Sequence, residues 1–471
     1  MIKFRLYHPL FLTLIYLVIH VLIRIYFSET LQVDDREQVL YGQYLRLGYP
    51  MPQPPLYSWL SWISFKFFGT NLFALTILKY TLIYATYVFI WRLTDKLFFE
   101  KNTKNLVFYS FFLMPSFFWH MHQGFTHTII LGLSIAMTTF YLVSLEENKK
   151  KSNYFYLGIS IGLGLMSKYS FILFLIPMFI ASLINSNFRK VFLSKNFFIT
   201  LLLVLFISGP HYFWLIDNYV EISQQASDRL AIVQNNLNFL TPLKELVVSA
   251  IGFITPLIFF LIPVVIKSIL TKRKKNLHSS SYKLFLNFFI VILISSIALF
   301  VFYDIPKVKV RWLHPIMMLF PFWFFLKYYA EDNYLNSFKK FFYFGVIFLT
   351  ILVIAIRVVQ MTIGPNLGYF SRVNTPVMET LRKIPNDISN NSLIIIEDYT
   401  IFAHALILFK NNQIRFGGMM FNKSNESPKK CLIISNTEKK IQGLNQRKLE
   451  TKIAKNIYEI YFQVKEKSKC Y

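Results

Sequence analysis

The fold of this protein is decided by its first long apolar run and the acidic segment that follows it. Residues 8–38 read HPLFLTLIYLVIHVLIRIYFSETLQVDDREQ. The part up to Phe27 has the length of about 20 residues that an α-helix needs to cross a bilayer. Lys3 and Arg5 precede it, and no cleavage site of small residues follows it. We therefore expect an uncleaved first membrane helix, followed at once by a polar loop with two adjacent acids.

The composition of the whole chain extends this prediction. Of its 471 residues 55% are hydrophobic and only 16% are charged, and the mean hydropathy is +0.44, which excludes a soluble globular enzyme. Apolar windows of membrane-spanning size recur along the first three quarters of the chain. They predict eleven spans, near residues 8–27, 72–92, 104–121, 124–144, 154–167, 169–185, 197–216, 246–267, 284–303, 311–328 and 341–361.

The basic residues predict the orientation of these spans. The net charge of +26 would suggest nucleic acid in a soluble chain, but here Lys and Arg cluster between apolar runs. With the N-terminus inside, the cytoplasmic segments contain 21 Lys and Arg and the opposite loops contain 10, as the positive-inside rule requires. We expect a multi-pass protein of the bacterial inner membrane with a cytoplasmic N-terminus, a periplasmic C-terminus and no nucleic-acid partner.

The chain divides by composition near residue 361. Residues 1–361 form the predicted membrane domain, with long periplasmic loops at 28–71 and 217–245. From Thr362 the sequence is polar and rich in lysine, with strand-like runs at Leu393–Ile396, Cys431–Ser435 and Ile457–Val464 and a helix-like run at Ile401–Phe409. Residues 362–471 are therefore predicted to be a small periplasmic α/β domain.

The first periplasmic loop carries the chemistry. Asp34 and Asp35 lie just beyond the first span, where a carboxylate can accept a proton from a hydroxyl or bind a cation. A solvated acidic cluster at the positive end of a helix dipole explains the same residues. Further on, Pro52, Pro54 and Pro55 favour a stiff, extended segment. The aromatic residues after it suit a stretch at the headgroup level.

These segments together resemble the bacterial membrane glycosyltransferases of the GT-C class, in particular those related to protein O-mannosyltransferases and to the aminoarabinose transferases of lipid A. The resemblance covers roughly residues 10–330. It is carried by the acid pair, the run QPPLYSWL at 53–60, FTHT at 125–128, GLGLMSKY at 162–169 and RWLHP at 311–315.

The resemblance implies transfer of one sugar from a polyprenyl-phosphate donor to an acceptor on the periplasmic face. The first acid of the pair, Asp34, is then the essential carboxylate, with Asp35 in the second position. The aminoarabinose transferases have Lys-Pro-Pro where this chain has Gln53-Pro54-Pro55. Since Gln53 carries no charge, either another cation neutralises the donor phosphate or the donor is held differently.

Candidate donor-binding residues occur in four segments. Lys168 lies beside Tyr169 at an outer helix junction, and Arg311 opens the tenth span, where its guanidinium suits a phosphate. Snorkelling and interfacial anchoring explain the two cations equally well. We also assign His127, Gln53 and Tyr57 to the donor-binding site.

No cofactor or metal is indicated by the sequence. His120, His122 and His127 are close in the chain but have no carboxylate in the same turn, and the two cysteines, Cys431 and Cys470, form no metal-binding pattern. Neither a P-loop nor a Rossmann glycine pattern is present. The sequence allows a divalent metal ion, but no residue pattern indicates one.

The acceptor is predicted less directly. The C-terminal domain has 17 Lys and Arg and 9 acids, which suits an anionic acceptor such as lipid A or lipopolysaccharide core. A protein hydroxyl is the main alternative. A transporter of lipid-linked sugars would also need many spans, but it predicts internal repeats, which the sequence does not show.

Overall fold

A computed structural model of the chain describes residues 8–230, 240–270, 279–302, 308–328, 336–422, 428–437, 446–453 and 456–466. The chain forms two compact units, each of which is assembled from separated segments. Unit 1 comprises Met1–Leu17, Arg46–Tyr57 and Lys79–Val353, and unit 2 comprises Val18–Leu45, Ser58–Leu78 and Ile354–Tyr471. Parts of the first loop predicted at 28–71 belong to unit 2 together with the residues from Ile354 onward.

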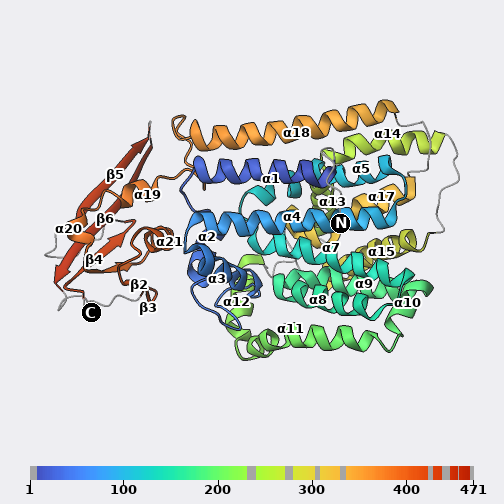
Figure 1. Ribbon diagram of the computed structural model, residues 1–471, viewed down its shortest axis with the longest axis horizontal. Coiled ribbons are helices and arrows are strands. Elements are labelled where there is room, and N and C mark those ends of the chain that lie inside the picture. The colour runs from blue at the N-terminus through green and yellow to red at the C-terminus, as the bar shows by residue number, and fades with distance from the viewer. Residues whose placement is uncertain are drawn as a thin grey trace. The chain divides into compact units, whose positions relative to one another are not determined.

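Helices dominate the chain up to residue 362 (Figure 1). The α-helices are α1 (Pro9–Tyr26), α2 (Val33–Tyr41), α3 (Leu56–Phe68), α4 (Leu72–Leu97), α5 (Lys101–Ser110), α6 (Pro115–Phe118), α7 (Thr126–Glu147), α8 (Lys151–Ser167), α9 (Ile172–Ile184), α10 (Ser186–Phe192), α11 (Phe197–Asp217), α12 (Tyr219–Leu230), α13 (Leu240–Ile254), α14 (Leu257–Leu270), α15 (Ser280–Phe302), α16 (His314–Met317), α17 (Phe320–Tyr328) and α18 (Asn336–Thr362). Short 3₁₀ helices are η1 (Phe111–Leu113), η2 (His120–His122), η3 (Tyr169–Phe171) and η4 (Val310–Leu313).

The structure does not confirm the number of spans that the sequence predicts. Within the described residues, 6 helices are long and apolar enough to cross a membrane, or up to 8 if each of two bent pairs is one span. The chain is thus a multi-pass membrane protein, but the eleven predicted spans are not confirmed. Proline explains two of the differences. The window 104–121 is broken at Met114, before Pro115, and the window 311–328 is divided among η4, α16 and α17, with Pro315 and Pro321 in the first turns of α16 and α17. Proline lacks the amide hydrogen and is tolerated in the first turn of a helix but disfavoured in its interior.

Close helix packing in unit 1 depends on glycines. A Cβ at Gly158 of α8 would come within 3.0 Å of the Thr200 backbone in α11, and one at Gly162 would meet Ile207 at 2.9 Å. Small residues at such positions let helix backbones approach in a bilayer, where packing rather than water exclusion drives association. Helix α8 is thereby held against α11.

Unit 2 contains the C-terminal α/β fold (Figure 1). Its strands are β1 (Ser392–Ile396), β2 (Ile414–Phe416), β3 (Met419–Phe421), β4 (Lys430–Ser435), β5 (Arg447–Ile453) and β6 (Asn456–Glu466), and its helices are α19 (Val377–Leu381), α20 (Asn386–Ser389) and α21 (Tyr399–Leu408). The strand order is β3-β2-β1-β4-β6-β5. Strand β1 is parallel to both β2 and β4, and the remaining pairs are antiparallel. All three predicted strands and the predicted helix are present; β2, β3 and β5 were not predicted.

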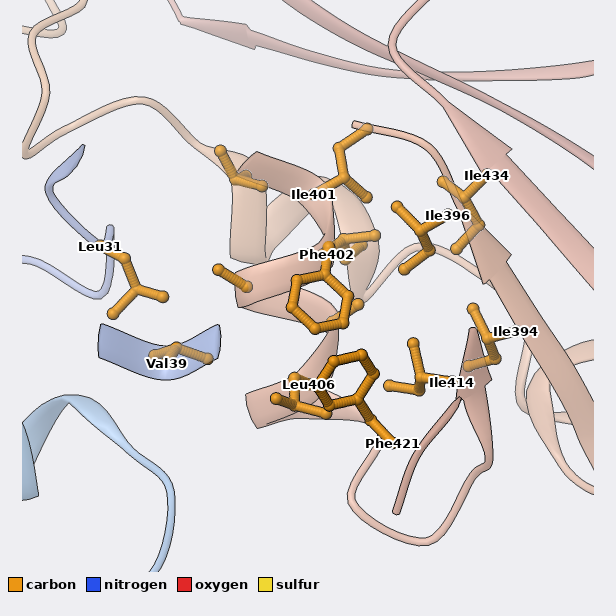
Figure 2. Close-up of a cluster of buried hydrophobic side chains, with 14 of the residues drawn as sticks. Leu31, Val39, Ile394, Ile396, Ile401, Phe402, Leu406, Ile414, Phe421 and Ile434 are labelled. Carbon is orange, nitrogen blue, oxygen red and sulfur yellow. The ribbon is translucent and has the colours of Figure 1, made fainter. Parts of the chain in front are cut away.

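One hydrophobic core joins the first loop to this sheet (Figure 2). Leu31 and Val39, beside and on α2, belong to the same buried cluster as Ile401 and Phe402 of α21 and Ile394 of β1. The core explains why the loop clusters with the C-terminal domain. On the other face of β1 and β4, Cys431 is buried and disulfide-bonded; the second cysteine in the sequence, Cys470, lies outside the described residues.

Candidate active site

The two adjacent acids of the first loop have different surroundings. Both lie in the first turn of α2, where successive side chains point about 100° apart around the helix. Asp35 is buried, whereas Asp34 is partly exposed. The helix therefore presents the two carboxylates to different neighbours.

Asp35 is held by a buried ion pair. Its Oδ2 accepts hydrogen bonds from Arg24 Nη2 at 3.2 Å and from the backbone N–H of Gln32 at 3.1 Å. Arg24 also donates to Ser28 Oγ at 2.9 Å and to the Thr30 carbonyl at 2.6 Å. The side chains of Arg24 and Asp35 are only 5% and 8% exposed. This network fixes the chain between the end of α1 and the start of α2.

Helix α2 is also bound to α21 of the C-terminal sheet. Arg36 donates from Nη1 to Thr400 Oγ1 at 2.7 Å and from Nε to the Leu31 carbonyl at 3.0 Å. The Leu31 N–H donates to His404 Nε2 at 2.9 Å, and His404 Nδ1 donates to the Thr400 carbonyl at 2.7 Å. These bonds assign His404 as the neutral tautomer with its hydrogen on Nδ1.

The protonation of His404 makes the stability of unit 2 depend on pH. Burial lowers the pKa of His404 to about 4, and the charges of Arg36 and Arg24 act in the same direction. The unfolded chain, with a pKa near 6.5, binds more protons between these values, so acid favours unfolding. We expect a stability loss of roughly 3 kcal/mol that develops as the pH falls from about 6.5 to about 4.

Thermal unfolding of wild type and His404→Gln in detergent at pH 7.5 and pH 5 tests this expectation. A glutamine oxygen can accept the Leu31 N–H but does not titrate, so the variant should show a smaller decrease in melting temperature. Equal decreases in the two proteins would assign the acid sensitivity to other groups.

Three of the motifs quoted above meet within unit 1. The ring of Tyr57, from the proline-rich run, lies 5.8 Å from that of His127. His127 Nδ1 lies 3.3 Å from the Ser167 carbonyl, to which it donates. Lys168 Nζ donates to Thr128 Oγ1 at 3.0 Å. The segments 53–60, 125–128 and 162–169 thus contribute side chains to one cluster.

Tyr169 joins this cluster to the first loop through a histidine. Its hydroxyl lies 3.2 Å from His211 Nε2, and His211 Nδ1 lies 2.8 Å from the Leu47 carbonyl. The loop also passes directly over α11, because a Cβ at Gly48 would come 2.0 Å from the Trp214 ring. His211 therefore fixes both Tyr169 and the start of the proline-rich segment.

Two further histidines have Lys168 or Arg311 as electrostatic neighbours. His314 is fully buried, stacks on Phe117 with ring centroids 5.2 Å apart, and lies within electrostatic range of Lys168 and His120. His120 is in turn an electrostatic neighbour of Arg311. Both ring nitrogens of His314, like Oε1 of Gln53, have no hydrogen-bond partner among the described residues. We call Lys168, Arg311, His120 and His314 the Lys168–Arg311 cluster, in which lysine and arginine supply the positive charge.

The histidines of the outer turn have separate partners. His122 lies between two tyrosines, with Tyr16 Oη at 2.9 Å and Tyr80 Oη at 3.2 Å from its ring nitrogens. His120 stacks on Phe125 instead, with ring centroids 5.3 Å apart. Over the described part of the chain, no group of three or more His, Cys, Asp or Glu is arranged to hold a metal ion.

The predicted residues are thus distributed over two units. Asp34 and Asp35 belong to unit 2, and Gln53, Tyr57, His127, Lys168, Tyr169 and Arg311 belong to unit 1. Sequence reasoning missed Arg24, His211 and His404 as structural partners of these groups. The available signal was a polar side chain inside an apolar run, which in membrane proteins marks a functional or paired position.

The chain has similarity to known membrane glycosyltransferases. Residues 52–214 match the dolichyl-phosphate-mannose-protein mannosyltransferase family. The lipopolysaccharide core galacturonosyltransferase RgtB of Rhizobium johnstonii is 28% identical over 376 residues, which are 78% of this chain and 75% of that protein. The corresponding enzyme RgtA of the same organism is 24% identical over 399 residues, 84% of this chain and 79% of the relative.

Solved structures show the same fold. The crystal structure of ArnT from Cupriavidus metallidurans bound to undecaprenyl phosphate aligns with a TM-score of 0.56 at 9% identity, over 96% of this chain and 97% of that one. These comparisons confirm the resemblance to GT-C class membrane glycosyltransferases. At this identity the ArnT alignment establishes the fold only.

Proposed function

We propose that the protein transfers one sugar from a polyprenyl-phosphate donor to lipopolysaccharide, on lipid A or the core, at the periplasmic face of the inner membrane. The single observation that carries the proposal is the first turn of α2, in which Asp35 is fixed by Arg24 while its neighbour Asp34 stays partly exposed. A carboxylate placed in this way suits a general base.

The reaction requires one proton acceptor and neutralisation of one phosphate. Asp34 takes the proton of the acceptor hydroxyl, whose oxygen forms the new bond to the anomeric carbon. The bond from that carbon to the phosphate oxygen breaks, and polyprenyl phosphate leaves with the electron pair. Because the leaving group is anionic, cations that stabilise it lower the barrier.

The Lys168–Arg311 cluster of unit 1 suits the donor phosphate. Lys168 and Arg311 supply positive charge in place of the lysine that Gln53 replaces. Buried polar atoms normally have a partner, and phosphate oxygens or sugar hydroxyls of the donor would supply one for His314 and Gln53. His127 and Tyr57 pack beside Lys168 through Ser167 and Thr128 and would line the same site.

Three findings support lipopolysaccharide as the acceptor class. RgtA and RgtB are lipopolysaccharide core galacturonosyltransferases by name, so galacturonic acid is the first sugar to test. The excess of Lys and Arg in the C-terminal domain suits an anionic acceptor. A disulfide at Cys431 is typical of an oxidising compartment such as the periplasm, where an acceptor on the outer face of the inner membrane would be met.

The deciding experiment is incubation of the purified protein with a panel of undecaprenyl-phosphate sugars and extracted lipopolysaccharide, with products read by mass. A mass increase of one sugar on lipid A or core is expected. The match to the protein mannosyltransferase family favours a protein acceptor as the second candidate. Altered glycoproteins with unchanged lipopolysaccharide in a deletion strain would establish that alternative.

Removing either cation should weaken donor use. We expect Lys168→Gln and Arg311→Gln each to raise the donor KM about tenfold, the equivalent of about 1.4 kcal/mol, because each loses one charge near the phosphate. Steady-state kinetics at varied donor concentration measures this. Lys309→Gln is the matched control, because Lys309 lies over the Trp312 ring at 5.3 Å. A donor KM that is unchanged in both test variants would remove the two residues from the site.

A further inference from the structure

The C-terminal sheet has a topological switch point at the carboxyl ends of β1 and β4. Strand β1 has a parallel neighbour on each side, and the chain leaves it through α21 to reach β2 and later returns to β4 on the other side. Asp398, which follows β1, accepts a hydrogen bond at 2.9 Å from Asn436, which follows β4. In open α/β sheets, ligands bind outside the carboxyl ends of the strands at such a point.

In this protein the chain's own helix α2 binds at that edge. Arg36 contacts Thr400 in the first turn of α21, and it has Asp398 and Tyr458 as electrostatic neighbours. Tyr458 lies beyond the carboxyl end of β4, since the last residue of β4, Ser435, pairs with Tyr461. Open α/β sheets bind ligands at the carboxyl ends of their strands, but here the carboxyl ends of β1 and β4 hold helix α2, which carries Asp34.

The contact combines polar and apolar interactions. Leu31 and Val39 enter the core that includes Ile401 and Phe402 (Figure 2). Around this core, Leu31 and Arg36 of the first loop bond to Thr400 and His404 of α21. We call these four residues the α2–α21 joint. On its other side, α2 is tied to α1 by the Arg24–Asp35 pair.

We propose that the C-terminal sheet is a positioning domain for the catalytic helix, and that Thr400 and His404 are positioning residues that act on Asp34 through Arg36 and Leu31. This inference rests on the proposed role of Asp34. Two-sided attachment restricts both the tilt and the rotation of α2. These restraints set the direction of the Asp34 carboxylate. The direction matters because a displacement of about 1 Å in a catalytic group costs roughly a hundredfold in rate.

The test compares Thr400→Val with Thr400→Ser, and His404→Leu with His404→Gln, in full-length protein in lipid nanodiscs. Valine and leucine remove the joint's hydrogen bonds, whereas serine and glutamine can keep them. We expect the first member of each pair to lower kcat about tenfold to a hundredfold with an unchanged donor KM, and the second member to retain most of the wild-type kcat. Amide hydrogen exchange of α2 should become faster in the same two impaired variants.

Thr380→Val is the matched control. Thr380 Oγ1 bonds to Thr451 Oγ1 at 2.7 Å elsewhere in unit 2 and contacts no residue of α2 in that bond. Its loss should leave kcat and α2 exchange unchanged. Wild-type kcat and α2 exchange in Thr400→Val and His404→Leu would overturn the inference, and so would an equal loss in Thr380→Val. Hydrogen exchange needs no catalysis, so it tests the joint even if Asp34 proves not to be the base.

Discussion

Replacing Asp34 by asparagine is expected to lower the rate of sugar transfer by about 10²- to 10⁴-fold, the contribution of a positioned general base. Asparagine has the size of aspartate but cannot take a proton at neutral pH. Because Asp34 is partly exposed and Asp35 makes the buried ion pair, the melting temperature should stay close to that of wild type. Mass-resolved product formation with a fixed donor and acceptor measures the rate.

Glu29→Gln is the matched control for this variant. Glu29 lies five residues before Asp34 and forms a surface ion pair with Arg382 at 2.6 Å. Its neutralisation removes one carboxylate from the same loop without touching α2, so transfer should continue at the wild-type rate. Full turnover in Asp34→Asn would remove the proposed base and, with it, the mechanism.

Replacing Asp35 by asparagine should instead unfold the site. Its carboxylate compensates the charge of Arg24, which is 4% exposed, and Asp35 Oδ2 also caps α2 through the Gln32 amide. Breaking a buried ion pair by removing one partner costs about 3–5 kcal/mol, because the remaining charge stays desolvated. We expect a clearly lower melting temperature and loss of transfer together, read by thermal unfolding and activity on the same sample.

A double variant separates charge compensation from the acid itself. The double variant Arg24→Met, Asp35→Leu removes both charges of the buried ion pair. It should recover much of the stability that Asp35→Asn loses, since apolar replacements of buried pairs are often neutral. Recovery will be partial because the Thr30 carbonyl loses its donor. A wild-type melting temperature in Asp35→Asn would show that the pair contributes nothing to unit 2.

Properties that depend on local sequence were predicted from the chain alone. The first apolar run forms α1, and the windows near 72–92, 124–144, 197–216, 284–303 and 341–361 each match one long helix over most of their length. The three predicted strands are formed as well. Apolar length is enough for the helices, because a bilayer requires every backbone group to bond within the segment. Short apolar runs are enough to indicate the strands. The other windows form a short helix, as at α8, or are interrupted, as between α13 and α14, and hydropathy alone does not detect such breaks.

The sequence by itself determined the membrane class, the GT-C resemblance and the motif residues, because each is written in a short contiguous run. Only the tertiary structure gave Asp34 and Asp35 different surroundings. The Arg24 that fixes Asp35 is 11 residues away in the chain, and the His404 that holds Leu31 is 373 residues away. No local pattern encodes such partners. Two adjacent, chemically identical side chains differ in burial because folding brings different groups to each of them.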